Sequence, residues 1–118
     1  MLNALAGRPI HLACGVTDLR KSIDSLAAQV QLAFQLDPCS PALFVFCNRG
    51  RNKLKILEWT DHGFWLHYFR LERGHFQWPV PGDATTQAIT ARQLQWLVDG
   101  LAVEQPLAHR PLRERRVV

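Results

Sequence analysis

A cationic run near the middle of the chain is the feature best suited to binding another molecule. Four Lys or Arg residues fall within the seven residues 49–55, and two further Arg residues follow on the next apolar stretch. Such side chains neutralise phosphates, and a projecting basic turn can lie along a nucleic-acid backbone. A hairpin tip that is merely solvated is the alternative. The candidate nucleic-acid-binding residues are Arg49, Arg51, Lys53, Lys55, Arg70 and Arg73.

Large aromatic residues follow the cationic run. A three-residue turn at 61–63 would place Trp59 opposite Trp65, with His67 on the same face as the lysines of the run. Aromatic rings beside cations can stack on bases, and an exposed aromatic face can also bind a protein. Paired tryptophans also occur in hydrophobic cores, and a slip of one residue would exchange the faces. The candidate partner-interface residues are Trp59, Trp65 and His67.

Catalytic groups are not arranged in any recognisable pattern. The acids near the cationic run are Glu58, Asp61 and Glu72, and no spacing forces them into the carboxylate cluster that metal-assisted phosphodiester cleavage needs. No phosphate-binding loop or nucleophile motif is present. Asp18 is a further acidic residue, and a position at the start of a helix, where a negative charge is favourable, accounts for it. The sequence therefore predicts a protein that is not an enzyme and holds no cofactor.

The cysteines are three in number, Cys14, Cys39 and Cys47, and their spacing is irregular. A zinc site that combines them with His11 can be drawn, but paired ligands at zinc-binding spacing are missing. A disulfide framework usually needs an even count and an oxidising compartment. We expect reduced thiols and no bound metal.

The elements that must position these residues can be predicted from periodicity. Thr17 is a candidate N-cap for a helix whose apolar positions run from 19 to 34, and Pro38 follows its end. A second helix should begin at the capping box of Thr90 and Gln93 and carry apolar residues to Leu101. The predicted strands are 9–13, 42–47, 53–60, 64–72 and a short one at 75–78, with a loop at 79–89.

This order of elements predicts an α+β fold. The run 42–47 is apolar throughout, which is typical of a strand buried on both faces. Strands adjacent in sequence should pair antiparallel as a β-meander of three to five strands, with the two amphipathic helices on one face in a two-layer arrangement. We expect a single domain at 1–103 and a basic, flexible tail at 104–118.

The 118 residues carry a net charge of +4, concentrated in the central block and in the tail. No apolar run is long enough to span a bilayer, and no secretory signal is recognisable, so we expect a cytoplasmic protein. If nucleic acid binds, the hairpin tip should contribute more than the tail, because a flexible tail must first be ordered.

A series of short motifs runs through most of the chain, from Gly15 to Leu101. These motifs are Gly15-Val-Thr-Asp-Leu-Arg-Lys21, Leu43-Phe-Val-Phe-Cys-Asn-Arg49, Lys53-Leu-Lys-Ile-Leu-Glu-Trp59, Gly63-Phe-Trp-Leu66 and Arg70-Leu-Glu-Arg-Gly74 with Phe76, Trp78 and Pro79. In order and spacing they resemble one known family, the TnpB accessory proteins encoded by the second open reading frame of insertion-sequence-66-type transposable elements. Leu19, Gly50, Asn52 and Phe69 depart from the residues that are usual there, and two of these departures replace a typical cation.

The resemblance implies a role in DNA transposition and recombination beside a separate transposase of the same element. Two classes of function remain open. The chain could be an accessory protein that binds DNA through the basic hairpin. Alternatively, it could be an adaptor that binds the transposase or a second copy of itself without touching DNA. Retention on heparin or nonspecific DNA, with a steep salt dependence, would distinguish the two classes.

Overall fold

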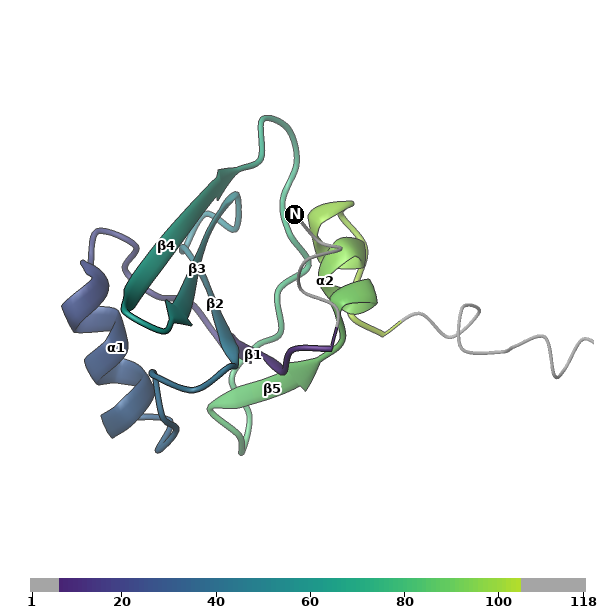
Figure 1. Cartoon of the computed structure of the whole chain (residues 1–118). Coiled ribbons are helices and arrows are strands. Elements are labelled where there is room, and N and C mark those ends of the chain that lie inside the picture. The colour runs from purple at the N-terminus through teal and green to yellow at the C-terminus, as the bar shows by residue number, and fades with distance from the viewer. Residues whose placement is uncertain (1–6, 105–118) are drawn as a thin grey trace, which may run out of the picture.

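The apolar runs of the sequence form one five-stranded sheet in the computed structural model, which describes residues 7–104. The strand order is β4-β3-β2-β1-β5, so β4 and β5 are the two edges (Figure 1). The elements in chain order are β1 (Ile10–Ala13), α1 (Ile23–Leu32), β2 (Leu43–Cys47), β3 (Lys53–Thr60), β4 (Gly63–Arg70), β5 (Thr86–Ile89) and α2 (Ala91–Val98).

The predicted meander is present over β2, β3 and β4, which pair antiparallel in sequence order. Its last turn is shorter than predicted, because Thr60 pairs with Gly63 and only two residues connect the strands. Two-residue turns are favoured in hairpins because their twist matches that of the strands. The predicted register is therefore wrong by one residue: Trp59 lies opposite Phe64, and Trp65 lies opposite Glu58.

The prediction that all neighbouring strands run antiparallel is wrong for β1 and β2, which are parallel. Helix α1 forms the crossover between them, as a parallel pair requires. The far side of β1 pairs antiparallel with β5. Strand β5 lies in the segment predicted as a loop, whereas the predicted short strand at 75–78 is not a strand, although Phe76 and Trp78 are buried.

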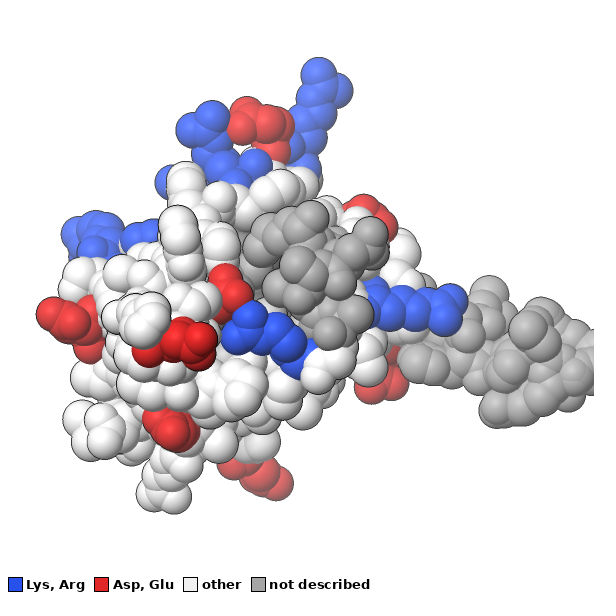
Figure 2. Space-filling view, viewed as in Figure 1, with Lys and Arg blue, Asp and Glu red and all other residues white. Residues whose placement is uncertain are grey.

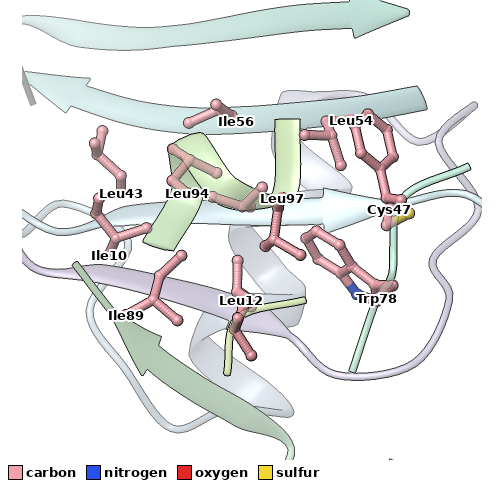
Figure 3. Close-up of a cluster of buried hydrophobic side chains, with 13 residues drawn as sticks. Ile10, Leu12, Leu43, Cys47, Leu54, Ile56, Trp78, Ile89, Leu94 and Leu97 are labelled. Atoms are coloured by element: carbon pink, nitrogen blue, oxygen red, sulfur yellow. The ribbon is translucent and has the colours of Figure 1, made fainter. Parts of the chain in front are cut away.

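The two helices lie on opposite faces of the sheet, so the prediction of two layers with both helices on one face is also wrong (Figure 1). Strand β2 is buried on both sides, as predicted, and its alternate residues enter two different cores. One core includes Phe44 and Phe46 of β2 together with Leu26 and Val30 of α1. The other core contains Leu94 of α2 and is shown in Figure 3; it also includes Ile10, Leu12, Leu43, Val45, Cys47, Leu54, Ile56, Trp78, Ile89 and Leu97.

The helix starts differ in how well the sequence predicted them. Thr90 and Gln93 form the predicted capping box at the start of α2, with bonds in both directions. Helix α1 instead begins after Ser22, and Thr17 is buried five residues earlier. The Thr17 amide donates to the carbonyl oxygen of Cys47 at 2.7 Å, so this segment extends the end of β2 rather than starting a helix. Neither helix described here has the length and apolar character needed to cross a membrane.

Candidate nucleic-acid interface

A groove lies where the chain leaves β1 and β2. Because these strands are parallel, their carboxyl ends meet at the same edge, and the segment 14–22 lies beside the β2–β3 turn. Ligands commonly bind at this end of open α/β sheets. The groove has a volume of 720 Å³ and is lined by Val16, Thr17, Asp18, Leu19, Arg20, Asn48, Arg49, Gly50, Lys53, Lys55 and Tyr68.

The β2–β3 turn, residues 48–52, is ordered by its own two asparagines. The Asn48 Oδ1 atom accepts hydrogen bonds from the backbone amides of Asn52 and Lys53, each at 3.0 Å. Its Nδ2 atom donates to Asn52 Oδ1 at 2.9 Å. Arg51 takes a positive φ of 55°, and its amide donates to the Asn48 carbonyl oxygen at 3.0 Å. The turn therefore presents its cations from a backbone that is already fixed.

The segment that follows β4 also holds this turn. Carbonyl oxygens of three consecutive turn residues accept bonds from it: Gly50 from His75 Nδ1 at 2.9 Å, Arg51 from the Phe76 amide at 2.7 Å, and Asn52 from the Leu71 amide at 2.7 Å. Figure 2 shows Lys and Arg side chains gathered over this end of the molecule and near the segment before α1, with most acidic side chains lower in the view.

The groove's cations differ in what else they contact. The Lys55 ammonium donates to the carbonyl oxygen of Leu19 and, at 3.5 Å, to that of Lys21, so it ties the segment before α1 to β3. The Arg20 guanidinium donates to both carboxylate oxygens of Asp18, from Nε to Oδ1 at 2.9 Å and from Nη2 to Oδ2 at 2.8 Å. This hydrogen-bonded pair holds the pKa of the Asp18 carboxyl well below its usual range and raises that of Arg20.

The Lys53 and Arg49 side chains make no hydrogen bond or ion pair to any residue within 7–104. Lys53 lies directly opposite Arg70 on β4, and Lys55 lies opposite Tyr68. These four residues share the α1 side of the sheet, because alternate residues of a strand point to the same face. Tyr68 is 56% exposed, so its ring is available beside the cations.

The six predicted cationic residues are only partly brought together. Arg49, Lys53 and Lys55 line the groove, and Arg70 extends their strip along β4 while forming an ion pair with Glu72 at 2.9 Å. The other two lie elsewhere. Arg51 borders a separate hollow formed with 75–80 and 102–104. Arg73 is exposed beyond the end of β4 and does not line the groove.

The three predicted interface residues lie on two faces. Trp59 is half-buried on the α1 side, where its ring meets that of Phe64 edge-on at 5.0 Å. Trp65 and His67 lie on the α2 side, with their rings stacked at 6.3 Å. Trp65 is 60% exposed. His67 Nε2 lies 2.7 Å from Glu58 Oε1, and this contact, together with Arg8, lowers the pKa of Glu58.

Sequence reasoning missed Tyr68, Asn48 and the segment 16–20 as parts of the groove. The missing information was the pairing of β1 with β2, which no local pattern encodes. A signal was nevertheless present, since a strand, a helix and a strand in succession is the order that a parallel pair requires. Phe69, where the resembled family more often has a cation, lies on the α2 side opposite Leu54, so this departure removes no charge from the groove.

No three His, Cys, Asp or Glu side chains gather as metal ligands within the described part of the chain. Cys47 is buried in the α2-side core, and burial raises the pKa of its thiol to about 12. Cys39 is exposed and Cys14 is partly buried. The arrangement of the groove, with cations, an aromatic ring and hydrogen-bonding side chains, suits an anionic ligand.

Most of the chain is similar in sequence to known proteins. Residues 8–108 match the family described as IS66 Orf2 like protein. The uncharacterized protein y4hO of Sinorhizobium fredii is 38% identical over 98 residues, which cover 82% of this chain and 84% of that protein. The uncharacterized protein y4jC of the same organism is 29% identical over 101 residues, 86% of each chain. No solved structure matches the chain.

Proposed function

This chain belongs to the IS66 Orf2-like family, and from that premise we propose that it assists the transposition of a bacterial insertion sequence by binding nucleic acid in the groove. The family points to a role associated with transposition. A separate transposase of the same element would carry out the strand chemistry. The groove would contribute contacts to the phosphate backbone and hold the DNA in a defined position.

The observation that carries this proposal is the convergence of cations at the carboxyl ends of two parallel strands. Arg20, Arg49, Lys53 and Lys55 line the groove, against the single acid Asp18. Arg49 and Lys53 remain free to meet phosphates, since neither is used by another described side chain. The exposed ring of Tyr68 adds a surface on which a base or sugar can stack.

The salt dependence of DNA binding tests this proposal. The variant Arg49→Ala/Lys53→Ala removes the two free cations of the groove. Its matched control, Arg51→Ala/Arg73→Ala, makes the same change in net charge at exposed positions outside the groove. A labelled duplex is titrated with each protein at several salt concentrations. The groove variant should flatten the log–log slope by roughly 1.8, at about 0.9 per phosphate contact, and the control should change it much less.

Two outcomes would contradict the proposal. Equal flattening in both variants would mean that total charge, rather than the groove, governs binding. If the unaltered protein does not bind duplex or single-stranded DNA at low salt, the adaptor function takes its place. A pull-down of the element's transposase with the unaltered protein and with the groove variant would then examine that function, which predicts equal capture by both.

A further inference from the structure

The outer edge of β4 carries an unused row of backbone hydrogen-bonding groups. The Leu71 amide bonds to the Asn52 carbonyl oxygen, which continues the β3–β4 register and identifies these residues as a hydrogen-bonded pair. In an antiparallel ladder such pairs recur at every second residue, so the odd-numbered residues of β4 point their amides at β3. The outward groups belong to Phe64, Leu66, Tyr68 and Arg70. None of them bonds to another backbone group within 7–104.

This edge also lacks the features that usually prevent pairing with another strand. Proteins protect exposed edges with proline, charge, bulges or very short strands. Strand β4 has eight residues without proline, and Arg70 at its end is its only Lys, Arg, Asp or Glu. The opposite edge, β5, has only four residues. Large apolar side chains are exposed along β4: Trp65 by 60%, Tyr68 by 56% and Phe69 by 40%.

We propose that β4 pairs antiparallel with β4 of a second copy of this chain, about a two-fold axis at His67. In this register Phe64 lies opposite the partner's Arg70, and Leu66 lies opposite the partner's Tyr68. It is the register that uses the outward amide and carbonyl groups of all four residues in both copies. The two sheets then form one continuous ten-stranded sheet with an isologous interface.

The side chains along this register complement one another. Trp65 lies opposite the partner's Phe69, so two exposed aromatic rings meet on each side of the axis. Because the register sets exposed Trp65 against exposed Phe69 in both halves, the aromatic side chains of this edge fit a second copy in the antiparallel sense.

The two-fold axis runs perpendicular to the sheet, which keeps equivalent faces on the same side. Both α1 faces, and with them both grooves, would therefore open in one direction. This consequence bears on nucleic-acid binding, but the pairing itself rests only on the β4 edge and does not depend on the proposed function. A dimer that binds no DNA would refute the proposed function and leave the β4 pairing standing, whereas a monomer that binds DNA would refute the pairing alone.

Disulfide trapping tests the register directly. All variants carry Cys39→Ser to remove the exposed native thiol. His67 faces its own counterpart across a non-hydrogen-bonded pair, where Cα atoms lie about 4.5 Å apart and a disulfide can form. His67→Cys should therefore form a covalent dimer on mild oxidation. The matched control Trp65→Cys should not, because its counterpart would lie four residues along the strand, about 13 Å away.

A second pair of variants keeps the test informative if loss of the His67–Glu58 contact disturbs the fold. Trp65→Cys/Phe69→Cys places both halves of each opposed pair in one chain, so the double variant should form a covalent dimer while neither single variant does. Sedimentation of the unaltered protein should show a dimer at micromolar concentration. Three outcomes would overturn the proposal: a monomer up to about 100 µM, crosslinking of Trp65→Cys alone, or no trapping by either design. The same outcomes are expected if another protein, rather than a second copy, occupies this edge.

Discussion

Replacing Lys55 with Met should destabilise the fold, whereas the same replacement at Lys53 should not. The two lysines lie two positions apart on one face of β3, and both are half-buried. Only Lys55 donates to the backbone, at the carbonyl oxygens of Leu19 and Lys21. Methionine keeps the aliphatic stem of either side chain, so the comparison isolates the ammonium group.

The magnitude follows from the contacts that are lost. The bond to Lys21 is long, at 3.5 Å, so the loss is essentially one charged hydrogen bond to the Leu19 carbonyl. Hydrogen bonds to charged groups contribute roughly 1.5–3 kcal/mol, and we expect the free energy of unfolding of Lys55→Met to fall by about 2 kcal/mol. Lys53→Met should stay within about 0.5 kcal/mol of the unaltered protein, as surface substitutions usually do.

Urea denaturation measures this difference. For a denaturant slope of about 2 kcal/mol/M, the midpoint of Lys55→Met should fall by about 1 M, and that of Lys53→Met should barely move. DNA titrations should show the converse specificity: Lys53→Met flattens the salt slope by roughly 0.9, the contribution of one phosphate contact. If Lys55→Met left the midpoint unchanged and flattened the slope as Lys53→Met does, the assignment of Lys55 as a tie between β3 and the segment before α1 would be refuted.

Three further predictions concern stability and reactivity. Gly15→Ala should lower the free energy of unfolding by roughly 1–3 kcal/mol in urea, because Gly15 has a φ of 78° and an added Cβ would lie 2.8 Å from a proline Cγ; an unchanged midpoint would contradict this. Glu58→Gln should lower the free energy of unfolding at pH 7, and this loss should shrink as the pH falls below 4.5. The reason is that the lowered pKa of the Glu58 carboxyl stabilises the fold only while that carboxyl is ionised; a loss that does not depend on pH would contradict this. Thiol titration should label Cys39 rapidly and Cys47 only after unfolding, since burial raises the Cys47 pKa to about 12; rapid labelling of Cys47 would show that this core opens.

The elements that the sequence predicted well are those with a long or self-contained local pattern. Strand β3 has the predicted bounds, and the capping box of α2 forms between residues only three positions apart. Strand β5 was missed because four residues, Thr86–Ile89, contain too few alternations to establish a period. Its strand conformation depends on pairing with β1, which lies more than seventy residues earlier in the chain.

The faces of the sheet depended on details that a short sequence pattern does not resolve. One residue more in the β3–β4 turn would have placed Trp59 and Trp65 together, and the actual two-residue turn separates them. The opposed helices, however, could have been predicted. A strand that is apolar at every position from Leu43 to Cys47 must be covered on both sides, which excludes placing both helices on one face.

Of the groove's lining, the sequence indicated Arg49, Lys53 and Lys55, which lie close together in the chain. Their neighbours across the groove come from residues 16–20, and the distance between these two segments is set by the parallel pairing of β1 with β2. Tyr68 lies in the groove because the β3–β4 register differs by one residue from the predicted register.

The bonds from the 71–76 segment to the β2–β3 turn determine which parts of this protein could be exchanged between relatives. Every backbone carbonyl from Gly50 to Asn52 accepts a hydrogen bond from that later segment. Two of the three donors are backbone amides, so a foreign turn of the same length can keep these bonds whatever its side chains, whereas a turn of another length would lose them. Chimeras that exchange residues 48–52 between relatives should therefore fold when the turn keeps its five residues.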